Sequence, residues 1–136
     1  MLQRMDAAQW SVLVAAVEVA ATGLVLLVRP SLFAWLVFGA EFSDAGYALA
    51  RLTAIGLFGL AFATWPVSGT TSDPASSVRG LLIHNVLATF YLFYVGIGGQ
   101  LTGILLWPAV ALHAIFSILL GRAWRAMRAL QGDFSI

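Results

Sequence analysis

Glu18 is the residue of this sequence with the clearest chemical potential. It lies near the middle of an apolar stretch, residues 7–28, that is long enough to cross a bilayer. A charge at that depth costs about 3 kcal/mol or more, so the carboxyl group must be neutral, paired or in contact with water. A buried acid that binds and releases protons is the working part of many transporters. A protonated carboxyl could equally make one structural hydrogen bond, and both interpretations stay open.

Depth in the membrane suggests a partner for Glu18. His113 lies near the middle of the last apolar stretch and matches Glu18 best in depth. Arg51 lies nearer the outer surface and His84 nearer the inner one. Ser117, four residues after His113, shares its helix face and could orient the imidazole. The sequence therefore predicts a Glu18–His113 pair, provided that the first and last helices are neighbours.

A second polar set lies on the third apolar stretch. His84 and Tyr91 share one helix face, and Asn85 and Thr89 share an adjoining one. This pattern predicts either a polar lining in the cytoplasmic half of the bundle or hydrogen bonds between helices without further function. Two membrane histidines also raise b-type haem as an alternative. His84 and His113 would then be staggered by four or five positions, roughly 6–8 Å along the helices.

Signatures of soluble enzymes are missing, so no catalytic residue and no metal site are predicted. The chain has no cysteine, which excludes disulfides, thiolate metal sites and thiol nucleophiles. The glycine-rich turn at 96–99 lacks the lysine and the preceding strand of a phosphate-binding loop. A formal net charge of +1 provides no basic field for nucleic acid.

The elements that must position these residues are transmembrane helices. Of the 136 residues, 61% are hydrophobic and only 10% are charged, whereas soluble domains have about 25% charged residues. The length allows one domain, 1–136. We predict an all-α membrane protein, a four-transmembrane-helix bundle. Its spans are expected at about 7–28, 45–65, 80–98 and 102–124.

The apolar segment 31–38 is too short to span a bilayer. Arg29-Pro30 precedes it and Gly39 follows it, which favours a separate short helix. We expect an interfacial or re-entrant helix between the first two spans. The alternative is a bent continuation of the first helix. That first helix itself is expected to be retained and not cleaved as a signal peptide, because no small-residue cleavage site follows it.

The distribution of arginine predicts the orientation. Five arginines fall on the side of both termini and two on the other side, which predicts cytoplasmic N- and C-termini. These are Arg4, Arg79, Arg122, Arg125 and Arg128 against Arg29 and Arg51. The five tryptophans lie near predicted helix ends, as an interfacial aromatic belt requires. The use of arginine without any lysine suggests a GC-rich bacterial genome, and hence a bacterial inner membrane.

Small residues on the first two spans predict close helix packing, because helices associate in lipid where their backbones can approach. We expect these two spans to form the tightest pair. The second span contributes Ala48, Ala50, Ala54, Gly56, Gly59, Ala61 and Ala63, and the first contributes Ala15, Ala16, Ala20, Ala21 and Gly23.

Part of the pattern resembles the DoxX-like group of small, largely uncharacterised bacterial four-helix membrane proteins. The matching stretches are Leu26-Leu27-Val28-Arg29-Pro30, Phe38-Gly39, Gly46-Tyr47-Ala48-Leu49-Ala50-Arg51-Leu52, Gly56, Gly59, Leu106-Trp107-Pro108 and His113. The resemblance implies a four-helix bundle and no particular activity or cofactor. The stretch around Glu18 is also similar to the first helix of small multidrug transporters, although segment 31–38 departs from their order.

These observations lead to one principal hypothesis and two alternatives. The principal one is a non-enzymatic membrane protein without a cofactor that packs against partner membrane subunits, as a homo-oligomer or with another protein, or binds lipophilic molecules. The first alternative is proton-coupled transport of a small molecule by Glu18 and His113. The second is a haem-binding membrane subunit with His84 and His113 as ligands.

Overall fold

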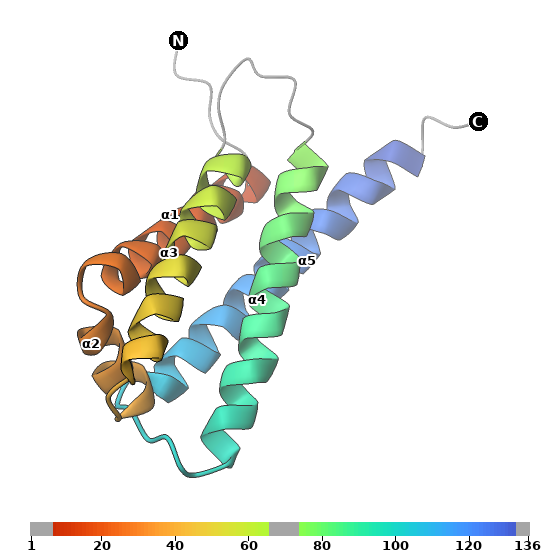
Figure 1. The fold of residues 1–136 in the computed structure, drawn as a ribbon. Coiled ribbons are helices and arrows are strands. Elements are labelled where there is room, and N and C mark those ends of the chain that lie inside the picture. Colours follow the sequence, from red (N-terminus) through yellow and green to blue (C-terminus); the bar gives the residue numbers. More distant parts are fainter. Residues whose placement is uncertain (1–6, 66–73, 133–136) are drawn as a thin grey trace.

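The computed structural model describes residues 7–65 and 74–132, and every regular element within them is a helix. Four helices are long and apolar enough to cross a membrane: α1 (Ala7–Val28), α3 (Asp44–Thr64), α4 (Pro74–Ile97) and α5 (Leu106–Gly132). Two short helices, α2 (Pro30–Phe33) and the π-helix η1 (Ala34–Phe38), lie between α1 and α3. Figure 1 shows the long helices alongside one another, with α5 crossing obliquely. The predicted fold class, an all-helical multi-pass membrane protein with a four-helix bundle, is confirmed.

The ends of the early helices follow local chemistry. Arg29 leaves the helical conformation (φ −138°, ψ 63°) because the following Pro30 disfavours it, and Pro30 occupies the first turn of α2. Gly39 ends η1 with φ +68°, a left-handed conformation that glycine adopts without strain. Ser43 caps α3 by accepting a hydrogen bond from the Gly46 amide at 3.2 Å. The short helical segment expected between the first two spans is therefore present.

The last two helices begin away from their predicted positions, and α5 also ends beyond its predicted limit. α4 begins at Pro74, about six residues before the predicted start, because its polar first turn is compatible with a helix that extends beyond the apolar region. α5 begins at Leu106 instead of 102 and continues beyond 124. Residues 66–73, which connect α3 to α4, lie outside the described residues.

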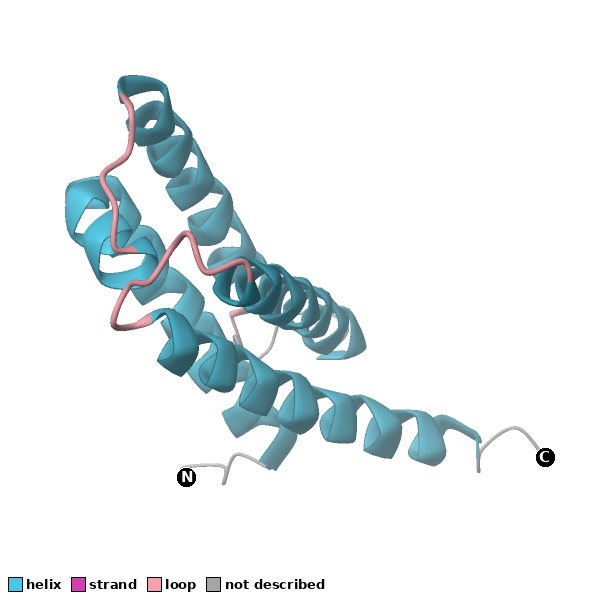
Figure 2. Ribbon diagram, turned by 90° about the horizontal axis from the view of Figure 1, so that it is seen from below, coloured by secondary structure: helices cyan, strands magenta, loops and turns pink. Residues whose placement is uncertain are grey.

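The connection before α5 packs against η1, which explains the late start of α5. The amide of Thr102 donates to the Phe38 carbonyl at 3.0 Å, and that of Leu105 donates to the Leu36 carbonyl at 2.7 Å. Gly103 lies so close that an added Cβ would overlap the Val37 carbonyl. Figure 2 shows this end of the molecule, where the connections lie.

All four long helices contribute to the main core. Its buried members are Val12, Ala15 and Val19 of α1, Ala61 of α3, Val78 and Leu81 of α4, and Phe116, Leu120 and Ala123 of α5. The most extensive helix contact joins α4 to α5, and the contact of α1 with α3 comes second. That α1 and α3 form the tightest pair stays a prediction, because α4 and α5 are also the longer helices. α3 turns only some of its small residues inward. Ala50, Ala54 and Ala61 are buried, whereas Gly56 and Gly59 have no atom within 4 Å of an added Cβ.

The two ends of the bundle differ in charge. The end where α1 and α4 begin and α3 and α5 finish carries Arg79, Arg122, Arg125 and Arg128. Arg29 precedes α2 at the opposite end and Arg51 lies nearer that end, in α3, while Arg4 is outside the described residues. Tryptophans lie near both ends: Trp10, Trp65 and Trp124 at the first and Trp35 and Trp107 at the second.

Candidate functional site

A hydrogen-bonded pair joins α4 to α5 inside the bundle. Asn85 is completely buried and His113 is 9% exposed. The Asn85 Nδ2 group donates to the Leu81 carbonyl at 2.9 Å, which leaves Oδ1 pointing toward His113. That oxygen lies 2.8 Å from His113 Nδ1. Asn85 therefore occupies the position beside His113 that the sequence predicted for Glu18.

This arrangement determines which nitrogen of His113 carries the proton. Because Asn85 Oδ1 can only accept, His113 Nδ1 must donate. The neutral imidazole then has its lone pair on Nε2, the arrangement that leaves Nε2 available to accept a proton or to ligate a metal. The pair is thus both a structural link between two helices and a defined chemical group.

His84 lies beside His113, closer than the sequence predicted. The two ring centroids are 5.9 Å apart and the rings are inclined by 76°. His84 lies thirteen residues, about 20 Å, before the end of α4, and His113 lies seven residues, about 10 Å, after the start of α5. The two histidines nevertheless lie side by side, because the last turns of α4 extend beyond the level at which α5 begins, as Figure 1 shows. Haem ligation by these histidines stays a prediction, which a purified sample without Soret absorbance would refute.

Glu18 is not part of this hydrogen-bonded pair. Its Oε1 accepts a hydrogen bond from Thr22 on the same helix at 3.0 Å, and its Oε2 is buried without a hydrogen-bond partner. Within residues 7–65 and 74–132, no hydrogen bond joins Glu18 to His113. α1 and α5 are nevertheless in contact, as the predicted pair required. Thr22, one turn after Glu18, was missed although its spacing could have indicated it.

The remaining predicted site residues take up simpler positions. Ser117 donates to the main-chain carbonyl of His113 at 2.8 Å instead of orienting its ring. Thr89 likewise donates to the main-chain carbonyl of Asn85 at 2.8 Å. Tyr91 is 62% exposed, and Arg51 is also exposed on the outside of α3. The predicted lining of α4 therefore reduces to His84 and Asn85, without Tyr91.

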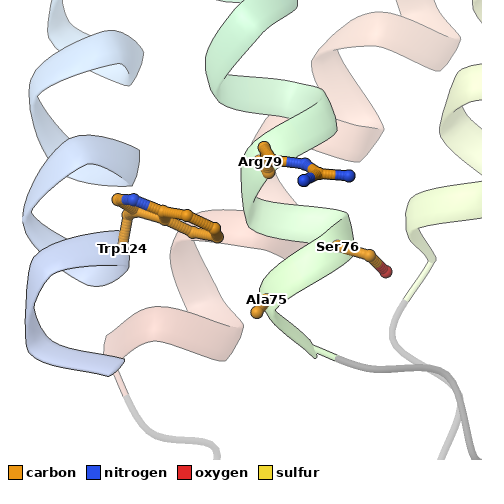
Figure 3. Close-up of a pocket in the computed structure, with 4 residues that line it drawn as sticks. All are labelled: Ala75, Ser76, Arg79 and Trp124. Atoms are coloured by element: carbon orange, nitrogen blue, oxygen red, sulfur yellow. The ribbon is translucent and has the colours of Figure 1, made fainter. Parts of the chain in front are cut away.

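A small pocket opens between α4 and α5 at the arginine-rich end. It has a volume of about 80 Å³ and is lined by Ala75, Ser76, Arg79 and Trp124. In Figure 3 the Trp124 ring reaches from α5 toward the turn of α4 that carries Arg79. Sequence reasoning missed this pocket, because its two sides come from residues 45 or more positions apart.

The chemistry available to these residues is that of binding and proton exchange. Among the described residues, no three histidine, cysteine, aspartate or glutamate side chains come together as a metal site would require. No protein-family model matches the chain, and neither a curated protein nor a solved structure matches it. Function therefore has to be inferred from the residues of the chain itself.

Proposed function

We propose that the protein is a non-enzymatic component of a bacterial inner membrane that assembles with a second copy of itself through the outer face of α3. The observation that carries this proposal is the open space at Gly56 and Gly59, where an added Cβ would meet nothing within 4 Å. Helices associate in lipid through such small residues, because they let two backbones approach closely.

One face of α3 packs against α1, and the opposite face is exposed. Ala50, Ala54 and Ala61 are buried, and Ala54 packs against Gly23 of α1. On the opposite side, Gly59 and Ala63 are one turn apart and both exposed. Since α1 already satisfies the inner face, the outer face is free for a helix from another molecule.

A second copy supplies the matching surface by symmetry. A two-fold axis beside α3 brings the same small-residue face from each protomer into one contact, which is the commonest way that proteins form dimers. Both protomers then keep the same orientation in the membrane. Arg79, Arg122, Arg125 and Arg128 at one end support an orientation in which that end, with both termini, is cytoplasmic.

The absence of cysteine from the chain makes a crosslinking experiment decisive. A63C should form a covalent dimer in native membranes on mild oxidation, because any disulfide must join two molecules. A21C, at an exposed position nearer the middle of α1, is the control for random collision and should stay monomeric. The bulky variant G59L should abolish the dimer and leave the helical circular dichroism unchanged.

Two results would overturn this proposal. One is equal crosslinking of A63C and A21C, which indicates random collision. The other is a monomer in mild detergent that carries a tightly bound lipid or other apolar molecule, which supports the binding of lipophilic molecules in place of assembly.

Proton-coupled transport is the second candidate, and the buried, unpartnered Oε2 of Glu18 favours it. An ionisable group within a membrane span that faces protein is a candidate for a proton pathway. Proteoliposomes with a trapped pH indicator should show proton uptake under an imposed potential, and E18Q should abolish it. T22V is the control, since it keeps the carboxyl group and removes only its hydrogen bond. Equal uptake by wild type and E18Q would remove this candidate.

A further inference from the structure

His84 and His113 are the two histidines of the chain, and the fold brings their rings together between α4 and α5. The ring centroids are 5.9 Å apart. An imidazole nitrogen lies about 1 Å from the centre of its ring and about 2 Å from a bound metal ion, so an ion in line between two imidazoles separates their centres by about 6 Å. The inclination of 76° between the rings is compatible with this arrangement, because each ring can rotate about the line through the ion. The spacing of the two rings is therefore that of a two-coordinate metal site.

Both rings have a nitrogen that an ion can reach. His113 Nδ1 donates to Asn85 Oδ1 at 2.8 Å, which leaves the lone pair on Nε2. His84 is held by no hydrogen bond within the described part of the chain, so its ring can turn a nitrogen toward His113. Within residues 7–65 and 74–132, the one fully buried side-chain nitrogen or oxygen without a hydrogen-bond partner is Glu18 Oε2. The nitrogens of the two histidines are therefore not closed off.

Asn85 holds His113 in the way that metal-binding histidines are usually held. Such a histidine generally donates its other ring N–H to a neighbouring oxygen, which fixes both the tautomer and the direction of the ring. Asn85 supplies that oxygen, and it is itself completely buried and anchored by its hydrogen bond to the Leu81 carbonyl at 2.9 Å. His113 is thus a preorganised nitrogen donor.

The number of available ligands selects the kind of ion. Most protein metal sites use three or more side chains, and among the described residues no three histidine, cysteine, aspartate or glutamate side chains come together. Zn²⁺ favours four ligands in a tetrahedron, and Mg²⁺ and Ca²⁺ favour six or more oxygens. Cu⁺ is stable in a linear complex with two imidazole nitrogens, because its filled d shell imposes no further geometry. Two histidines are sufficient for this ion.

The charge around the pair also favours a monovalent ion. The cost of moving an ion out of water rises with the square of its charge, so Cu⁺ costs about a quarter as much as a divalent ion of the same size. Arg79 lies five residues before His84, about 7.5 Å along α4, and its repulsion doubles for a divalent ion. Neither α4 nor α5 carries an acidic residue, and the hydrogen bond of Glu18 goes to Thr22 on α1. Little negative charge is therefore at hand to balance a second positive charge.

We propose that His84 and His113 bind a monovalent copper ion between α4 and α5, with Asn85 as the positioning residue for His113. Both histidines bind as neutral imidazoles, so the site gains one positive charge and releases no proton. A two-coordinate ion is readily passed on, because an incoming ligand can add before one of the first two leaves. This site is independent of the assembly through α3, because it lies on α4 and α5.

Competition with the chromophoric Cu⁺ chelator bicinchoninate, under reducing conditions, measures the affinity of the detergent-solubilised full chain. The wild type should bind one Cu⁺ per chain. N85L should lower the affinity about tenfold, since the loss of a residue that orients a metal ligand typically costs 10–100-fold, and H84Q and H113Q should each lower it by more than about a hundredfold. M127L removes a soft thioether from the same helix α5 and should change the affinity less than about twofold. Far-ultraviolet circular dichroism checks that each variant remains helical.

X-ray absorption at the copper edge tests the coordination itself. The wild type should show two nitrogen ligands in line. H84M replaces one ligand by another that binds Cu⁺ and should retain binding with one nitrogen and one sulfur, which also shows that the loss in H84Q is not a failure to fold.

Three results would overturn the proposal. One is an unchanged affinity in H84Q or H113Q, which places the copper elsewhere. Another is a wild-type site with three or more ligands, or displacement of Cu⁺ by excess Zn²⁺, either of which indicates a different set of donors. The third is a purified protein with Soret absorbance that does not take up Cu⁺, which assigns the two histidines to haem.

Discussion

The Asn85–His113 hydrogen bond should make a measurable contribution to the α4–α5 contact. Replacing Asn85 by leucine removes the acceptor for His113 Nδ1 and leaves that buried donor without its partner. An unsatisfied buried donor costs about 1–3 kcal/mol, whereas hydrogen bonds between membrane helices contribute about 0.6 kcal/mol on average and about 1.7 kcal/mol at most. We therefore expect N85L to lower the free energy of unfolding by about 2 kcal/mol.

A double-mutant cycle with H113F separates the hydrogen bond from the loss of packing. Because the second substitution finds the bond already broken, the double variant should be about 1 kcal/mol more stable than the sum of the two single effects predicts. Unfolding in mixed micelles with increasing dodecyl sulfate, followed by far-ultraviolet circular dichroism, measures all four proteins. T89V is the control, since Thr89 bonds only within α4. Additivity within about 0.3 kcal/mol would refute the argument.

Four further substitutions test other parts of the bundle. G103A should lower the free energy of unfolding by about 2–3 kcal/mol, since its Cβ would overlap the main chain of Val37, and a loss below about 0.5 kcal/mol in the same assay would contradict that packing. G23L should destabilise the α1–α3 contact by a similar amount, because Gly23 packs against Ala54 and Leu57 of α3. G56L faces open space and should leave the stability of the monomer within about 0.5 kcal/mol of the wild type. Equal effects of the two variants would show that the two faces of α3 are not distinct. E18L should raise the free energy of unfolding by about 1 kcal/mol because it removes a buried oxygen without a partner, and a loss of stability would assign Glu18 a structural role.

The number and order of the spans could be predicted from the sequence because they depend on local properties. A stretch of about 20 apolar residues crosses a bilayer wherever the rest of the chain lies. Arg29-Pro30 and Gly39 likewise act on their own backbone, so the short helix between them was predictable. Helix ends outside the apolar region were less predictable, since Pro74 and the polar turn after it are compatible with both a loop and a helix.

The contacts between helices could not be predicted in the same way. Depth placed Glu18 and His113 at similar levels, but it does not specify the direction in which each side chain points around its helix. The side chain of Asn85 points toward His113 and is its actual hydrogen-bond partner, whereas Glu18 bonds to Thr22. The proximity of His84 and His113 depends in turn on the packing of Gly103 against η1, which sets where α5 begins. That packing joins segments more than 60 residues apart, and no local pattern indicates it.

The difference between Asn85 and Glu18 bears on where function can be sought. Asn85 joins two helices with neutral groups, which avoids the cost of a charge in lipid and gives the pair a role in the fold. Glu18 carries the more costly group, yet its hydrogen bond goes only to Thr22 on its own helix and its second oxygen has no partner. A side chain that adds cost without linking helices is better explained by a task that involves a proton or a cation than by a contribution to stability. If E18L is as stable as we expect and E18Q abolishes proton uptake, the fold and the chemistry of this protein reside in separate residues. If both variants behave like the wild type, Glu18 has neither role, and the α3 interface remains the stronger proposal.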